Sequence, residues 1–131
     1  MWPVISQQLG AKNPHEVYWF YFSLNLDAVT TGDGRWKLQL PHTYNTLAGQ
    51  PGGKDGVPVL YSQRKIENEE LYDLVHDIGE TTDVAAQHPE IMKQLEAEVE
   101  TARADLGDAR TKRTGAGLRE PGRLNQNKNE N

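Results

Sequence analysis

The 131-residue chain contains no cysteine and no long hydrophobic run. The absence of cysteine excludes disulfides and metal sites built from thiolates, although it does not fix the cellular compartment. No stretch approaches the ~18 apolar residues of a membrane span. The first residues carry neither the basic segment nor the apolar core of a signal peptide, because Ile5 is followed at once by polar residues. We therefore expect no membrane partner, and localisation stays unknown from this chain.

Basic residues are also scarce, with 14 Lys and Arg against 19 Asp and Glu, and the net charge is −5. Because phosphate binding favours a concentrated basic face, we expect no nucleic-acid partner. A basic cluster does lie near the end of the chain, and we interpret it as part of a solvated tail, with a site for a sulfated polysaccharide as the alternative. The cluster consists of Arg110, Lys112, Arg113, Arg119 and Arg123.

Aromatic residues are concentrated in residues 17–22, which read Val-Tyr-Trp-Phe-Tyr-Phe. Aromatic and β-branched residues favour a strand, and alternate side chains of a strand point to opposite faces. Because both faces are bulky here, we predict a central strand that is covered on both sides, on one of them by a C-terminal helix.

Residues 26–30 and 36–40 are predicted to form a β-hairpin. Gly32 and Gly34 lie in the turn and are expected to take positive φ angles. On the second strand, Leu38 and Leu40 share a face with Trp36, while Lys37 and Gln39 face the other way. Pro41 ends this strand, so residues 42–44 are expected on a loop, where functional side chains are often displayed.

Residues 48–59 are rich in glycine and proline, but Lys54 is followed by Asp55, so they do not form a phosphate-binding P-loop. We expect a mobile surface loop. Residues 71–74 form a short ordered piece with Leu71 and Tyr72 as core anchors, and a turn follows at residues 77–80.

Asp83 is predicted to cap a helical turn at residues 84–87. Asp83 and the acidic residues before it, Asp73, Asp77 and Glu80, lack the alternate spacing of an EF-hand. We therefore attribute all four carboxylates to turn and capping chemistry.

Pro89 is suited to the first position of a helix, and apolar residues then recur at steps of three or four until Gly107. The apolar stripe consists of Ile91, Leu95, Val99, Ala102 and Leu106. The predicted fold is therefore α+β, with a small antiparallel sheet of three or four strands packed against one long C-terminal helix. We divide the chain into an entry segment (1–14), the α+β domain (15–110) and a polar, disordered tail (111–131).

The order of motifs resembles the C-terminal subdomain of arylsulfatase-type (type I) sulfatases. The motifs are Gly-x-Trp-Lys-Leu, Pro-His-x-Tyr, Leu-Tyr-Asp-Leu, Asp-x-Gly-Glu-Thr-Thr-Asp-Val-Ala and His-Pro-Glu. The resemblance extends from about residue 5 to about residue 124, and its most specific part is residues 70–85. Ile78 stands where proline is common in the family, and Asp83 stands where asparagine is common.

The resemblance implies a role in sulfate-ester hydrolysis as a fragment that is not catalytic by itself. The family's nucleophile, a formylglycine made from the Cys or Ser of Cys/Ser-x-Pro-x-Arg, and its calcium ligands belong to an N-terminal catalytic domain. This sequence has neither that motif nor Asp-Asn-Gly. We therefore expect no cofactor in this chain, a truncated gene product, and a sulfatase catalytic domain as the partner, in cis or in trans. Full-length relatives are often exported.

The resemblance also implies that the missing catalytic domain covers the second face of residues 17–22, and that this part of the fold borders the substrate pocket. Lys37, His42 and Tyr44 are the predicted substrate-binding residues, able to offer charge-assisted hydrogen bonds to a sulfated carbohydrate or an aryl sulfate. No catalytic or metal-binding residue is predicted. The alternative is structural: a histidine bonded to a backbone carbonyl and a tyrosine at the edge of the core.

Two other functions remain open from the sequence. One is a free-standing carbohydrate-binding or interaction module, which requires the aromatic residues at 18–22 to be exposed. The other is a small hydrolase that uses histidines with acidic partners, although the histidines lack the spacing of metal ligands. They are His15, His42, His76 and His88.

Overall fold

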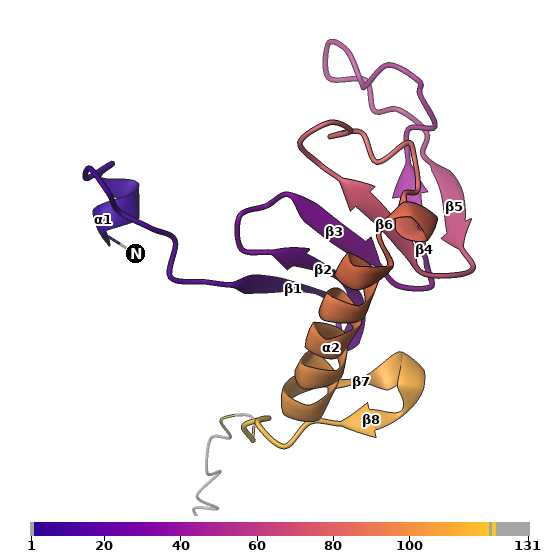
Figure 1. Ribbon diagram of the computed structural model, residues 1–131. Helices are drawn as coiled ribbons and strands as arrows, with labels where there is room; N and C mark the ends of the chain where they lie inside the picture. Colours follow the sequence, from indigo (N-terminus) through magenta and orange to yellow (C-terminus); the bar gives the residue numbers. More distant parts are fainter. Residues whose placement is uncertain (1, 121, 123–131) are drawn as a thin grey trace, which may run out of the picture.

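The computed structural model describes residues 2–120 and 122, and it confirms the α+β class. Four antiparallel strands form the main sheet in the order β1-β2-β3-β6. One long helix, α2, lies across one face of this sheet, which we call the inner face (Figure 1). The strands are β1 (Val17–Phe22), β2 (Asn25–Thr31), β3 (Trp36–Gln39) and β6 (Glu70–Asp73).

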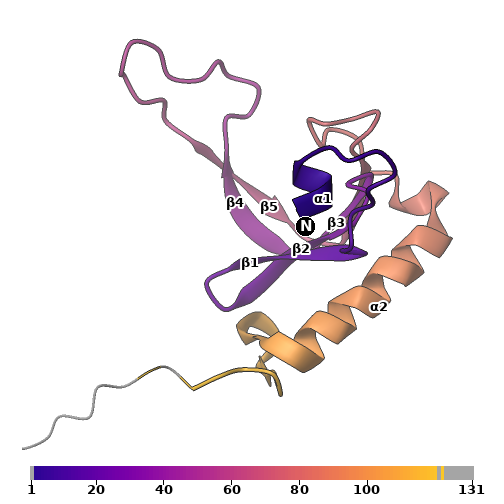
Figure 2. The ribbon, with the colours of Figure 1, turned by 90° about the vertical axis from the view of Figure 1, so that its left-hand side faces the viewer.

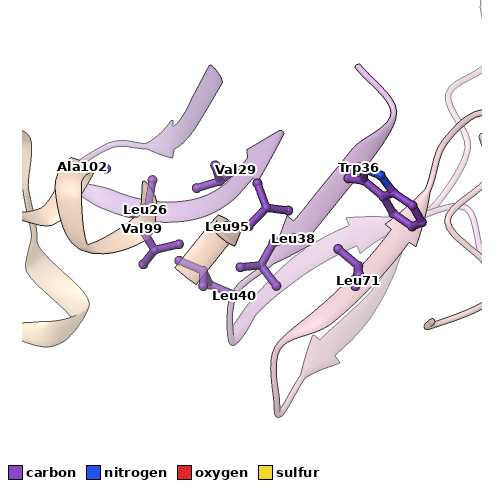
Figure 3. Packing of buried hydrophobic residues seen from close by; sticks show 9 residues of the cluster. All are labelled: Leu26, Val29, Trp36, Leu38, Leu40, Leu71, Leu95, Val99 and Ala102. Atoms are coloured by element: carbon purple, nitrogen blue, oxygen red, sulfur yellow. The ribbon is translucent and has the colours of Figure 1, made fainter. Parts of the chain in front are cut away.

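The inner face and α2 together make the hydrophobic core. Helix α2 spans Pro89–Leu106, with Pro89 in its first turn and Gly107 ending it at a φ of 81°. Of the predicted apolar stripe, Leu95, Val99 and Ala102 are buried against the sheet and Ile91 is partly buried, whereas Leu106 at the end of α2 is 37% exposed. Figure 3 shows Leu95, Val99 and Ala102 meeting the buried side chains of the strands. The remaining members of the core are Leu26, Val29, Trp36, Leu38, Leu40 and Leu71.

Strand β1 is an edge strand, so the prediction of a central strand was wrong. Its inward residues pack on the core, but its outward aromatic side chains, Tyr18, Phe20 and Phe22, are 39%, 48% and 76% exposed. The physical reason is that β1 pairs with β2 alone, and α2 covers only the inner face. The bulk of the outward side chains is therefore left uncovered by the described residues, and their burial against a missing catalytic domain stays a prediction.

The β2–β3 hairpin is confirmed, with Val29 opposite Leu38. On the outer face of the sheet, however, Gln39 is only 5% exposed, because other parts of the chain cover it. The turn also differs from the prediction. Gly34 has a φ of +75°, but Gly32 does not have a positive φ and is required for another reason: a Cβ atom there would lie 1.9 Å from the carbonyl oxygen of His15.

Residues 42–44 lie on a strand, not on the predicted loop. Strand β4 (His42–Thr46) pairs with β5 (Ser62–Ile66) as a second antiparallel hairpin, which leaves the sheet on the side away from α2 (Figure 2). The sequence did not indicate β5, because only Ile66 of its five residues is apolar. Irregular chain connects β4 to β5, where a loop was predicted, and its mobility stays a prediction.

The segment between β6 and α2 is held by carboxylates. Asp77 accepts hydrogen bonds from the backbone nitrogens of Thr81 and Thr82, at 2.7 and 2.8 Å. The helical turn is a 3₁₀ turn at Ala85–Gln87 whose cap position is Val84, one residue after the predicted cap. Asp83 instead accepts from the backbone nitrogens of Leu71 and Ala85, both at 2.9 Å, and so ties this segment to β6.

Ordered structure continues past residue 110, so the prediction of a disordered tail from residue 111 was wrong for residues 111–114. Strands β7 (Gly107–Asp108) and β8 (Arg113–Thr114) flank a 3₁₀ turn at Ala109–Thr111. Arg110, predicted to belong to the solvated cluster, donates to the Leu26 carbonyl at 3.1 Å and to Asp27 at 2.8 Å. The tail predicted for residues 121 and 123–131, Arg123 among them, lies outside the described residues. The entry segment carries a short helix, α1 (Trp2–Ile5).

A pair of glycine substitutions tests the β2–β3 turn. Gly32→Ala places a methyl group against the backbone of His15, so we expect it to lower the free energy of unfolding by more than about 2 kcal/mol. Gly34→Ala meets open space and carries only the cost of a positive φ, about 1 kcal/mol. Urea denaturation of both variants measures the difference, and equal losses would contradict the close packing of the entry segment on the turn.

The packing of Glu69, just before β6, on α2 makes stability depend on pH. Burial, and then repulsion from Glu96, raise the pKa of Glu69 above its ordinary 4.5, while Arg103 lowers it less. The folded state thus binds this proton more tightly than the unfolded state, and the free energy of unfolding falls as the pH rises from 4.5 through the folded-state pKa.

We expect Glu69→Gln to reduce the fall in the free energy of unfolding between pH 4.5 and pH 7, and to raise the melting temperature at pH 7. The matched control is Glu67→Gln, whose exposed side chain pairs only with exposed Lys65. Thermal melts from pH 4 to pH 8 compare the variants. A parallel fall in the parent and in Glu69→Gln would disprove the role of Glu69.

Candidate functional site

The three predicted substrate-binding residues line one cavity of about 350 Å³ on the outer face of the sheet. Lys37 extends from β3, while His42 and Tyr44 extend from β4, where alternate residues share a face. The structure therefore brings together the residues that the sequence singled out. The cavity is lined by Lys37, Gln39, His42, Tyr44, Thr46, Ile78, Gly79 and Glu80.

Lys37 is already paired within the cavity. Its Nζ atom lies 2.7 Å from Oε1 of Glu80, and Gln39 donates to the other oxygen of the same carboxylate. Both charged side chains are partly buried, so the pair is shielded from bulk water. The cavity therefore carries a neutralised cation, and an incoming anion would have to compete with Glu80 for Lys37.

His42 is oriented by the chain just before it. Its Nδ1 atom lies 2.6 Å from the carbonyl oxygen of Leu40. Because a carbonyl only accepts, Nδ1 carries the proton and donates, which leaves Nε2 for another partner. Nδ1 thus makes the bond to a backbone carbonyl that the structural alternative expects. Nε2 can still bind a ligand.

Tyr44 belongs to a hydrogen-bond network that the sequence did not reveal. Arg64, opposite Tyr44 on β5, donates to the hydroxyl oxygens of Tyr44 at 3.0 Å and of Tyr72 at 3.1 Å. It also forms an ion pair of 2.7 Å with Glu70. Because Arg64 is paired with Tyr44, the two side chains lie on the same face of the hairpin. The sequence alone could not indicate this contact, because it depends on knowing that the two strands pair.

The network changes the acidity of its members. Burial, and then the hydrogen bond to Glu70, raise the pKa of Tyr72 to about 12. The hydrogen bonds with Tyr72 and Tyr44 raise the pKa of Arg64. At physiological pH Tyr72 is therefore a neutral hydroxyl and Arg64 is a cation.

A second hollow of about 450 Å³ continues from the first. The two share Tyr44, Thr46, Gly79 and Glu80, so they form one groove, which we call the β4 groove. One end contains Lys37 and His42. The other end contains Arg64 and other side chains of β5, together with the chain between β6 and the 3₁₀ turn at Ala85–Gln87. The residues that add hydrogen-bonding groups there are Ser62, Gln63, Arg64 and Thr81.

The β4 groove opens beside the exposed aromatic residues of β1. Phe20 lies opposite Ala28, Ala28 opposite Gln39, and residues directly opposite in a sheet share a face. The Nζ atom of Lys37 lies 6.0 Å from the centre of the Phe20 ring. The exposed side chains of Tyr18, Phe20 and Phe22, which we call the aromatic stripe, therefore belong to the same outer face of the sheet as the groove.

The remaining histidines are apart from the groove lining. His76 contacts Asp73 at 3.0 Å, His88 packs on the ring of Trp36, and His15 on that of Tyr18. Within residues 2–120 and 122, no cluster of three or more acidic and histidine side chains is arranged to hold a metal ion. The helices in this part of the chain are too short or too polar to cross a membrane.

Compared with known proteins, the chain matches no protein-family model and no curated protein sequence.

Neighbouring substitutions on β5 test the Arg64 network. Arg64→Gln removes the donor to the hydroxyl oxygens of Tyr44 and Tyr72 and the cation paired with Glu70, so we expect a loss of about 1–3 kcal/mol in the free energy of unfolding. Lys65→Gln removes an exposed ion pair with Glu67, and its effect should stay within about 0.5 kcal/mol. Chemical denaturation compares the two, and equal effects would contradict the structural role of Arg64.

Proposed function

We propose that this chain is the C-terminal part of a formylglycine-dependent sulfatase, which packs on a catalytic domain and borders its substrate pocket. The motifs in residues 35–85 supply the family resemblance. The observation that carries the proposal is that an uncovered aromatic stripe and the β4 groove lie on the same face of the sheet. A catalytic domain seated on the stripe would reach the groove.

The aromatic stripe supports the first half of the proposal. Burying apolar surface is favourable by roughly 25 cal/mol per Å², and clustered exposed apolar side chains mark interaction sites. Tyr18, Phe20 and Phe22 extend in a row from an edge strand, and α2 covers only the opposite face. A partner domain would bury the outer face of β1, just as α2 buries the inner face.

The groove supports the second half of the proposal. His42 has one ring nitrogen oriented by Leu40 and the other available, and Tyr44 offers a hydroxyl held by Arg64. These groups suit hydrogen bonds to the oxygens of a substrate, and a protonated His42 would make such a bond charge-assisted. They bind and orient; none is a nucleophile paired with a base.

The reaction itself belongs to the catalytic domain. A formylglycine hydrate beside calcium supplies the attack on the sulfate ester in that family, and this sequence lacks the motif from which formylglycine is made. In this proposal the contribution of the present chain is to hold the alcohol part of the substrate through the side chains of the β4 groove.

Reconstitution tests the proposal. The full chain is mixed with a sulfatase catalytic domain that lacks its own C-terminal subdomain, and association and sulfate release are measured. We expect association and a gain in sulfate release. Phe20→Ser should weaken association at least tenfold, whereas Leu60→Ser, an exposed change in the β4–β5 loop, should not.

The substrate role is tested in the same reconstituted enzyme. His42→Ala and Lys37→Ala should raise KM or lower kcat/KM about tenfold without weakening association. Absence of association with catalytic domains from several sulfatase subgroups, together with a reading frame upstream that holds no Cys/Ser-x-Pro-x-Arg motif, would overturn the proposal.

A carbohydrate-binding module is the second candidate function, and the exposure of Tyr18, Phe20 and Phe22 favours it. Exposed aromatic rings in a row offer apolar surface on which sugar rings can pack. Titration of the full chain with neutral oligosaccharides, followed by tryptophan and tyrosine fluorescence, tests this function. Binding that Phe22→Ala abolishes would support it, and the absence of a response to any oligosaccharide would exclude it.

A further inference from the structure

We infer that the β4 groove takes the sugar portion of a sulfated saccharide and not the ring of an aryl sulfate. This inference rests on the proposed function and names the class of its substrate. It comes from three properties of the groove: the chemistry of its lining, the pairing of its charges and its volume.

The lining is built almost entirely from hydrogen-bonding side chains. Apart from glycines, Ile78 and Ala48 are the apolar residues among those that line the two hollows. Aryl groups are held by apolar and aromatic walls, and such walls dominate pockets for drug-like ligands. The aromatic rings in the described lining are the imidazole of His42 and the phenol of Tyr44, and both carry hydrogen-bonding groups; the ring of Tyr44 is suited to stacking against one face of a sugar.

The charges of the groove are paired. Lys37 pairs with Glu80, and Arg64 pairs with Glu70. A groove without excess positive charge does not favour a densely sulfated chain, because Glu80 would repel further sulfates. Sugar hydroxyls both donate and accept, so they can bond to a carboxylate and to a guanidinium or amide without breaking these pairs.

Arg64 also determines what Tyr44 offers to a ligand. Its Nη1 atom donates to the hydroxyl oxygen of Tyr44 at 3.0 Å, so the proton of that hydroxyl is left for a different acceptor. Arg64 in turn is fixed by Glu70 and Tyr72. Arg64 is therefore a positioning residue that keeps Tyr44 as a donor toward the groove.

The two hollows of the groove together offer more volume than one small ring requires. Its two ends measure about 350 and 450 Å³ and meet at Tyr44, Thr46, Gly79 and Glu80. Lys37 and His42 lie at one end and Arg64 at the other. A saccharide of two or more units, with its sulfate beyond the Lys37 end, would contact both ends, while an aryl sulfate would contact only one.

The test is an NMR titration of the isotope-labelled full chain. The probes are a monosulfated disaccharide, its unsulfated form, 4-nitrophenyl sulfate and inorganic sulfate. We expect both disaccharides to shift the amide signals of residues 42–46 and 62–64, and 4-nitrophenyl sulfate to shift at most the Lys37 end. Inorganic sulfate that reproduces the disaccharide shifts, or stronger binding of 4-nitrophenyl sulfate, would overturn the inference.

Two substitutions separate the roles of Tyr44. Tyr44→Phe keeps the ring and removes the hydroxyl, and losing one neutral hydrogen bond corresponds to about a two- to tenfold weaker Kd for the disaccharide. Tyr44→Ala should remove the response. Tyr61→Phe is the matched control, since Tyr61 is exposed and outside the groove lining. A Tyr44→Ala variant that binds like the parent contradicts the inference.

The reconstituted enzyme distinguishes this inference from the proposed function. If the chain restores sulfate release but 4-nitrophenyl sulfate has a higher kcat/KM than the sulfated disaccharide, the inference is wrong and the proposed function holds. If the chain fails to associate with a catalytic domain, the proposed function fails, and the NMR titration still reports whether the groove binds sugar.

Discussion

The four-stranded sheet has two faces, and the one long helix of the described residues, α2, covers only the inner of them. Leu95, Val99 and Ala102 of α2 seal the inner face and account for most of the helical contribution to the core. The outer face is divided. The β4–β5 hairpin and the turn at Glu80 cover the half at β3 and β6, while the half at β1 keeps its aromatic side chains in solvent. Both the β4 groove and the aromatic stripe result from this incomplete cover.

Polar groups hold the covered half of the outer face together. Gln39 and Lys37 bond to Glu80, and Arg64 joins Tyr44 of the hairpin to Tyr72 and Glu70 of β6. Groups of this kind are stable only when each donor has an acceptor, since unpaired buried polar atoms are costly. The same bonds that attach the hairpin to the sheet therefore fix the positions of the residues that line the groove. One set of contacts therefore both attaches the β4–β5 hairpin to the sheet and pre-organises the site.

The apolar patterns predicted the elements that pack on the core. The alternation at residues 36–40 predicted β3, and the repeat from Ile91 to Leu106 predicted α2, because burial on one face leaves a regular trace in the sequence. Strand β5 and the β7–β8 hairpin left no such trace. The residues Ser62 to Arg64 are polar, and Arg113 and Thr114 are exposed, so nothing in their composition required a strand. Their structure is decided by the backbone pairing that a preceding strand makes available.

The sequence by itself determined the α+β class, the long helix and the β2–β3 hairpin, since these follow from local periodicity. The choice of Lys37, His42 and Tyr44 came from the family resemblance, and their role in substrate binding stays a prediction. Only the tertiary structure decided that β1 is an edge strand, that residues 42–46 form a strand, and that Glu80 and Arg64 belong to the same groove. Periodicity reports whether a side chain meets apolar surroundings, but not which segment provides them. Partners such as Lys37 and Glu80, or Tyr44 and Arg64, are distant in sequence, and only the strand pairing and the turns bring them into contact.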